Sequence, residues 1–199
     1  MFEMLPQLFV LFLVIVDPLA SFSVFMTASS SMKIKERRKM ALYAVLLASL
    51  LAIVVILFGN NLLLLFNTTI DEFRVAGGII LGILGIRMAL GSPLVYNSDI
   101  ENNPHRAIAS IIATPLLTGP ATITALIITV KDYGIIETGT AVSLVLIVTA
   151  VLFLSSEKVN KYIGKTVIQM LSTIMGLIAL SWGVQFIVEG LHAVIGVIV

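Results

Sequence analysis

Long apolar stretches are the feature that most constrains this chain. The stretch from 40 to 66 contains no charged residue, and it exceeds the roughly 18 residues that mark a membrane-spanning helix. The run from Leu46 to Leu57 does not alternate between apolar and polar positions, as the strands of a membrane barrel would. Only 12% of the 199 residues are charged, which is about half of the share found in soluble domains. The sequence therefore predicts an all-α integral membrane protein.

Apolar runs separated by charged residues predict six membrane-spanning helices. We place them at 5–28, 40–66, 73–91, 107–130, 138–155 and 167–189. The second is long enough to tilt or to bend at Asn60-Asn61, where we expect a helix to end. The N-terminal segment lacks the basic start of a signal peptide, so we expect the first span to be retained. The chain is expected to be a multi-pass protein of the plasma or inner membrane, surrounded by lipid.

Basic residues predict how these helices are oriented. Ten of the twelve fall in or beside the odd-numbered connections, and only Arg74 and Lys131 fall on the other side. The ten are Lys33, Lys35, Arg37, Arg38, Lys39, Arg87, Arg106, Lys158, Lys161 and Lys165. Because cytoplasmic loops carry the excess of Lys and Arg, this split places the odd-numbered loops inside and both termini outside.

The six spans divide into two sets of three, and the second set enters the membrane from the opposite side. We therefore predict two inverted three-helix repeats, 1–91 and 107–199, joined by a cytoplasmic linker at 92–106. The last span of each repeat carries small residues at helical spacing, which favours close helix packing over a pore lining. These residues are Gly78, Gly82, Gly85 and Ala89 in the third span, and Gly176, Ala179 and Gly183 in the sixth.

Prolines interrupt the first and fourth spans near their midpoints, at Asp17-Pro18 and at Thr118-Gly119-Pro120. Proline lacks an N–H group and clashes with the carbonyl four residues earlier, so each helix should open there. Asp, Thr or Gly followed by Pro is also typical of a helix start. The sequence predicts that both spans are discontinuous and that each second half begins near the middle of the bilayer.

These two breaks predict a single substrate site. The start of a half-helix exposes N–H groups and a partial positive charge, and the end of the preceding half exposes carbonyl groups and a partial negative charge. Such a site suits a zwitterion, whose carboxylate would lie on the N–H groups and whose ammonium would lie on carbonyl and side-chain oxygens. The expected substrate-binding residues are Asp17, Pro18, Leu19, Ala20, Ser21, Thr114, Pro115, Thr118, Gly119, Pro120, Ala121 and Thr122.

Asp17 is the only acidic residue deep within a predicted span. Inserting a carboxylate at the bilayer centre costs about 2.5 to 3.5 kcal/mol, so Asp17 should face the interior and have a partner. It could hold a substrate ammonium, carry a coupling proton or help to bind a cation such as Na⁺, or it could only cap a kink. Arg87 and Glu189 lie near span ends, where we expect them to reach the membrane surface and play a structural role.

Other classes of function lack the residues they need. There is no cysteine, and His105 and His192 lie too far apart in depth to share a metal, so we expect no metal site. A Ser-His nucleophile, a carboxylate pair and a nucleotide-binding motif are also missing, and a net charge of +1 gives no surface for nucleic acid. We expect no enzyme and no cofactor other than a coupling H⁺ or Na⁺.

Secondary transport remains as the expected function. The alternatives are an ion channel or proton-conducting pore that uses Asp17, and a non-transporting membrane subunit. The sequence also leaves open a homo-oligomer.

The motifs of the two broken spans resemble one known family. The Asp17-Pro18 step, the basic loop that follows it, and the run from Thr114 to Ala121 are similar to the MarC family of membrane proteins over essentially the whole chain. Within that family, the resemblance to small neutral amino acid transporters of the SnatA type implies carriage of glycine, alanine or similar substrates. Many relatives have Asn where this sequence has Asp17, which leaves open whether the carboxylate couples protons or only caps the helix.

Overall fold

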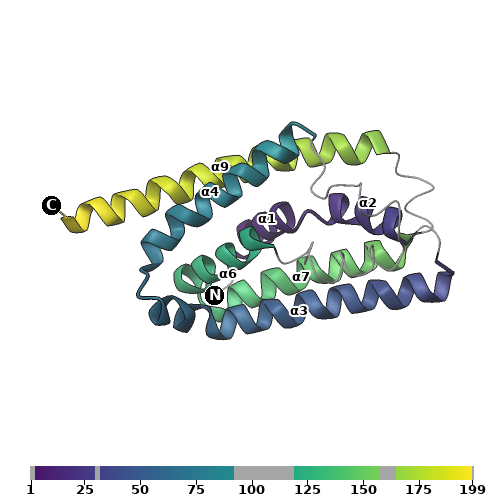
Figure 1. Cartoon of the computed structure of the whole chain (residues 1–199), viewed down its shortest axis with the longest axis horizontal. Helices are drawn as coiled ribbons and strands as arrows, with labels where there is room; N and C mark the ends of the chain where they lie inside the picture. The colour runs from purple at the N-terminus through teal and green to yellow at the C-terminus, as the bar shows by residue number, and fades with distance from the viewer. Residues whose placement is uncertain (1–2, 30–31, 92–118, 157–164, 199) are drawn as a thin grey trace.

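The structure is a computed structural model that describes residues 3–29, 32–91, 119–156 and 165–198. Within these ranges the regular elements are all α-helices, which confirms the all-α part of the expected fold class (Figure 1). They are α1 (Leu5–Val16), α2 (Pro18–Ala28), α3 (Ile34–Leu65), α4 (Ile70–Ala89), α6 (Pro120–Tyr133), α7 (Ile135–Leu154) and α9 (Lys165–Ile198).

Four helical segments of the described chain are long and apolar enough to cross a membrane. They are Leu5–Met26, which joins α1 and α2, then Ile34–Leu65, Ile135–Leu154 and Thr166–Gly196. Helix α4 has the length of a span, with 20 residues, but it carries charges at both ends. Helix α6 has 14 residues and covers only the later part of the expected fourth span, because 107–118 lies outside the described residues.

The end of α3 corrects one expectation. The helix continues without a break through Asn60-Asn61, so the predicted bend or end at these residues is wrong. Instead the helix ends after Leu65, where Asn67 adopts a left-handed conformation with φ 52. The Asn67 N–H donates to the Leu64 carbonyl at 3.1 Å, and the Thr68 N–H donates to the Leu63 carbonyl at 3.0 Å. This pair of hydrogen bonds is a Schellman cap, which satisfies the last carbonyl groups of the helix.

Helices α4 and α9 lie side by side in Figure 1 and pack through the predicted small residues. A Cβ atom added to Gly85 would lie 2.6 Å from the Gly176 carbonyl oxygen. One added to Gly183 would lie 2.8 Å from the Gly78 carbonyl oxygen. At these points backbone meets backbone, so a side chain larger than hydrogen has no room. The glycines therefore form a packing surface, as their spacing predicts.

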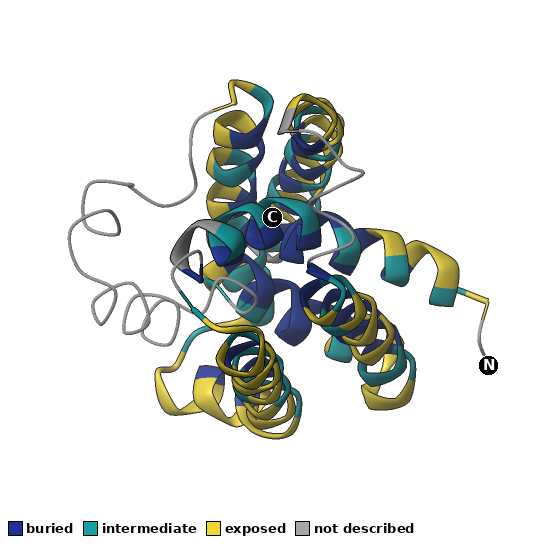
Figure 2. Ribbon diagram, turned by 90° about the vertical axis from the view of Figure 1, so that its right-hand side faces the viewer, coloured by how far each residue is buried: buried dark blue, intermediate teal, exposed yellow. Residues whose placement is uncertain are grey.

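The broken helix α1–α2 lies between two helix pairs, α4 with α9 on one side and α3 with α7 on the other (Figure 1). Among the 18 most apolar consecutive residues of this broken helix, 61% are buried, whereas among those of α3 only 22% are buried. Figure 2 shows the same contrast, with buried residues toward the centre and exposed residues on the outward faces. Many of the exposed residues are Leu, Ile and Val, which suits a surface covered by lipid.

Candidate functional site

The first span is interrupted at Asp17, as its sequence predicts. Asp17 separates α1 from α2 and has φ 39 and ψ 73, a left-handed conformation that Asp and Asn tolerate better than most residues. Its N–H donates to the Leu13 carbonyl at 3.1 Å and closes α1. The next residue, Pro18, has no N–H to offer to the Val14 carbonyl, so the helical ladder cannot continue. The discontinuous first span is confirmed.

The Asp17 carboxylate joins two parts of the chain that are far apart in sequence. One oxygen, Oδ1, accepts a hydrogen bond from the Ala20 N–H at 3.1 Å and so caps the start of α2. The other oxygen, Oδ2, accepts a hydrogen bond from the Ser172 hydroxyl on α9 at 2.8 Å. Asp17 is only 1% exposed. An acidic side chain is thus held in the protein interior by two neutral donors.

Ser21 completes the polar surroundings of this break. The residue is buried, and its hydroxyl donates to the Val16 carbonyl at 3.2 Å, which satisfies an oxygen at the end of α1. Pro18 is buried beside it, while Leu19 and Ala20 are half-buried. All the site residues predicted from the first span therefore cluster at the junction of α1 and α2.

The predicted residues of the fourth span are described only in part. Helix α6 begins at Pro120, with Gly119 as an extended N-cap of φ −69 and ψ 176. Ala121 and Thr122 follow in its first turn and are buried. Gly119 has no side chain with which to cap, and the described chain offers no other acceptor to the N–H groups of these two residues. Thr114, Pro115 and Thr118 lie outside the described residues.

The helices that carry the predicted site contact one another. Helix α1 packs against α6, α7 and α9, and α2 packs against α7 and α9 (Figure 1). Ser172 is a member of this site that the sequence reasoning missed. It lies four residues before Gly176, on the small-residue face of the sixth span. A hydroxyl group on this packing face could have indicated that Ser172 contacts another helix.

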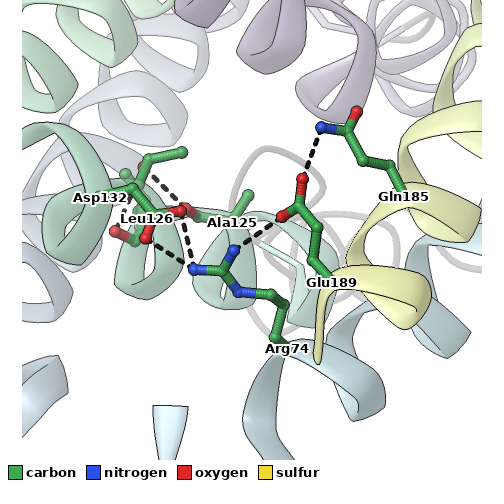
Figure 3. A network of polar contacts seen from close by, with 7 residues as sticks. Arg74, Ala125, Leu126, Asp132, Gln185 and Glu189 are labelled. Carbon is green, nitrogen blue, oxygen red and sulfur yellow. Dashed lines mark hydrogen bonds and ion pairs between the residues drawn. The ribbon is translucent and has the colours of Figure 1, made fainter. Parts of the chain in front are cut away.

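A second polar cluster lies on three helices and was also missed (Figure 3). Arg74 on α4 pairs through Nη2 with both carboxylate oxygens of Asp132 on α6, at 2.6 and 2.8 Å. Its Nη1 pairs with Glu189 Oε2 on α9 at 2.7 Å. The Gln185 amide donates to Glu189 Oε1 at 2.8 Å. Glu189, for which a structural role near a span end is expected, is part of this ion-pair network, and its side chain is 41% exposed.

A small cavity of about 30 Å³ lies beside this network, between α1, α6 and α9. Its polar wall includes Gln7, Thr129 and Trp182, together with Asp132 and Glu189 of the network. Its apolar wall includes Leu8 and Leu11 of α1. A cavity of this size is large enough to hold water.

Comparison with known proteins gives the chain a family. A family model described as "MarC family integral membrane protein" matches residues 2–195. A UPF0056 membrane protein of Methanocaldococcus jannaschii is 31% identical over 186 residues, which cover 89% of this chain and 91% of the relative. The UPF0056 inner membrane protein MarC of Escherichia coli is 27% identical over 207 residues, which cover 94% of this chain and 93% of the relative. No solved structure matches the chain.

The family model covers nearly the whole chain, and relatives of similar length are called membrane or inner membrane proteins. The apolar helices fit these descriptions, because several of them can cross a bilayer. The chain is a multi-pass protein of the cell membrane, and it belongs to the MarC family of integral membrane proteins.

Proposed function

We propose that this chain is a secondary transporter of small neutral amino acids such as glycine and alanine. It works by alternating access around a site formed by the Asp17 break and the start of α6 at Gly119-Pro120. The observation that carries the proposal is the buried Asp17, which sits at an interruption of a membrane helix and has only neutral hydrogen-bond donors among the described residues. Acidic residues at such depth are rare and are usually part of a substrate or ion pathway.

Asp17 is suited to hold the ammonium group of the substrate. Each carboxylate oxygen has two lone pairs, and the two hydrogen bonds from Ala20 and Ser172 leave acceptor sites free on both oxygens. A substrate ammonium would bring the positive charge that the two neutral donors do not supply. Binding would then offset part of the cost of keeping a carboxylate away from water.

The start of α6 is suited to hold the substrate carboxylate. The N–H groups of Ala121 and Thr122 point from a helix N-terminus, where the partial positive charge of the helix dipole favours an anion. The α6 start and Asp17 would face the same space to hold one substrate, and the contact between α1 and α6 is in keeping with that arrangement.

The side chains around the two helix starts favour a small neutral substrate. Ala20, Ser21, Ala121, Thr122 and Ser172 are all small, and none of them is charged. A charged substrate side chain would need a second buried counter-charge, and Asp17 is the only charged residue among the buried ones in the described part of the chain. Glycine and alanine fit this environment, in keeping with the resemblance to SnatA-type transporters.

Alternating access would use the two predicted halves of the chain. Asp17, Ser21 and Thr122 are each at most 2% exposed, whereas at the start of α6 Gly119 is half-buried and Pro120 is exposed. We infer that the inverted repeats 1–91 and 107–199 rock against each other and expose the site to one side at a time, with both termini outside. A proton or Na⁺ that alternates with the substrate ammonium on Asp17 would couple this movement to an ion gradient.

Uptake by proteoliposomes tests the proposal. Purified protein should accumulate labelled glycine and alanine under an imposed H⁺ or Na⁺ gradient, whereas lysine and aspartate should not be taken up. Protein-free liposomes and the Asp17→Ala variant serve as controls. No uptake combined with no binding by calorimetry would contradict the proposal. Single-channel currents that need no substrate would instead support the channel alternative.

A further inference from the structure

The ion-pair network of Arg74, Asp132 and Glu189 lies at the opposite end of α9 from the candidate site. Glu189 follows Ser172 by 17 residues, which is about 25 Å along a helix. Arg74 and Lys131 are the two basic residues that the sequence assigns to the outer side, so this end of the bundle is predicted to face outside. The network is therefore too far away to touch a substrate at Asp17.

The two ion pairs of Arg74, here called the two arms of the network, join different helices. The Arg74–Glu189 arm joins α4 to α9, and these helices already pack backbone against backbone through their glycines. The Arg74–Asp132 arm joins this pair to the end of α6. Since α6 begins at the proposed substrate site, the second arm connects the site-bearing half-helix to the α4–α9 pair.

The geometry of the second arm is that of a strong but reversible contact. The Arg74 side chain is 14% exposed and that of Asp132 is 29% exposed, so water can reach both partners when they separate. A single guanidinium nitrogen, Arg74 Nη2, contacts both Asp132 carboxylate oxygens, and the opposite charges of the partners strengthen these hydrogen bonds. The buried Arg74 Nε has no partner within the described residues, so the closed network leaves one donor unsatisfied.

The small cavity connects this network to the broken helix. Its wall contains Asp132 and Glu189 at the outer end, and Leu8 and Leu11 of α1, the helix that ends at Asp17. Movement of α6 away from α9 would widen this space along α1 toward the site.

We propose that Arg74, Asp132 and Glu189 form a latch that closes the outer end of the substrate path, and that separation of Arg74 from Asp132 opens it. This inference rests on the proposed function, because it assumes a path that leads to Asp17. Opening moves the end of α6, while α4 and α9 stay packed as one unit.

The chain contains no cysteine, so a single introduced cysteine can report on opening. Thr129→Cys places a thiol on the cavity wall at a position that is 1% exposed. In membranes, a membrane-impermeant thiol reagent added from outside should label this cysteine slowly in the parent chain. Adding Arg74→Gln or Asp132→Asn should speed labelling by roughly tenfold, which corresponds to about 1.4 kcal/mol of latch stability.

Two controls separate a latch from a general stabilising role. Arg87→Gln removes the same charge from the other end of α4, where Arg87 is exposed and has no hydrogen bond or ion pair with the described residues, so labelling should not change. Thr149→Cys places a buried reporter on α7, and its labelling should also be unaffected by Arg74→Gln. Unchanged labelling at Thr129→Cys, or equal acceleration at both reporters, would overturn the latch.

The labelling experiment needs no substrate, so it can fail separately from the proposed function. Faster labelling in the latch variants without glycine uptake by the parent protein would support the latch and contradict the proposed substrate. Glycine uptake with no change in labelling would keep the transporter and reject the latch.

Discussion

The two proline-led helix starts, at Pro18 and at Pro120, differ in what lies before the proline. Asp17 is left-handed, caps α2 through its carboxylate, and receives a second hydrogen bond from Ser172. Gly119 is extended and has no side chain to cap α6. The start of α2 therefore presents a carboxylate that already accepts a hydrogen bond from a backbone N–H group. The start of α6 presents N–H groups without an acceptor in the described chain.

This difference gives the two ends of a zwitterion different partners. An ammonium needs oxygen atoms and negative charge, which the Asp17 side supplies. A carboxylate needs N–H groups and positive potential, which the start of α6 supplies, because its first N–H groups have no acceptor in the described chain. Two identical helix starts would favour two substrate groups of the same charge, which a zwitterion does not have.

Removing the carboxylate should have the largest effect. Asp17→Ala should abolish glycine uptake, because the variant loses both the negative charge and the cap of α2. Asp17→Asn should keep the left-handed backbone and the cap but lose the negative charge, so glycine should bind more weakly, and the remaining uptake should lose dependence on a proton gradient if the carboxylate carries the proton. Uptake and binding by calorimetry in liposomes check both results.

Asp71→Asn is the matched control for these variants. Asp71 is an aspartate in the first turn of α4, outside the proposed site, so its replacement should leave uptake unchanged. Normal, proton-dependent uptake by both Asp17 variants would show that Asp17 is only the cap of a kink.

A capping side chain at position 119 should weaken binding of the substrate carboxylate at the start of α6. The backbone at Gly119 is extended and accepts any residue, so Gly119→Asp should fold with its side chain on the first-turn N–H groups. That carboxylate would compete with the carboxylate of the substrate. We expect the Kd for glycine to rise by about tenfold or more, as loss of one hydrogen bond to a charged group implies.

Gly119→Ala is the control for this change, because it adds a side chain that cannot accept a hydrogen bond. Calorimetry with glycine should show nearly normal affinity for Gly119→Ala. Equal weakening by both substitutions would indicate that space, and not the free N–H groups, matters at this position.

Most of the fold and half of the candidate site could be predicted from the sequence. Apolar runs predict helices because the bilayer leaves backbone groups no other partners, and the Asp17-Pro18 break follows from the missing N–H of proline. The predicted span bound at 66 agrees with the end of α3 after Leu65, but the bend or end expected at Asn60-Asn61 was wrong, because the position of a helix end depends on local backbone bonds.

The contacts that could not be predicted join residues far apart in the chain. Ser172 lies 155 positions from Asp17, and Glu189 lies 115 positions from Arg74. Nothing in the local pattern of either segment specifies its partner, because these pairs depend on how α9 packs against α2 and α4. The packing of α4 on α9 was predictable from their glycines, but the polar pairs along it were not.

Ser172 should have a smaller effect than the helix starts themselves. Ser172→Ala removes the donor to Asp17 Oδ2, which leaves the carboxylate in place with one hydrogen bond fewer. Because a hydrogen bond to a charged group contributes about 1.5 to 3 kcal/mol, we expect uptake to fall by about tenfold with the fold intact. Ser172→Thr keeps the hydroxyl and should restore most of the activity in the same uptake assay. If Ser172→Ala transports normally, α9 does not help to position Asp17.

The start of α4, which has an ordinary side-chain cap, is a reference for the two proline-led helix starts, and loss of this cap should have the smallest effect on transport. The Thr69 hydroxyl accepts from the Glu72 N–H at 3.2 Å, and the Thr69 N–H donates to Glu72 Oε2 at 2.8 Å, at the start of α4. Thr69→Ala should lower the stability of the protein by about 1 kcal/mol, measured by thermal unfolding in detergent. Glycine uptake should not change, because this cap lies outside the proposed site. Reduced uptake would mean that any weakened helix start impairs transport.

The same cap should respond to acid. Its backbone and side-chain hydrogen bonds with Thr69 lower the pKa of Glu72 below its ordinary value. The cap therefore contributes its full stability above the ordinary Glu pKa and loses it as the pH falls through the lowered value.

The most direct test of the two-ended site is the position of bound glycine. Solid-state NMR on liposome-embedded protein can measure the distance from the glycine nitrogen to the Asp17 carboxyl carbon, and from the glycine carboxyl carbon to the amide nitrogens of Ala121 and Thr122. The account predicts both distances to be within about 4 Å, as hydrogen bonding requires. Bound glycine that is far from Asp17, or that lies with its carboxylate toward Asp17, would contradict it.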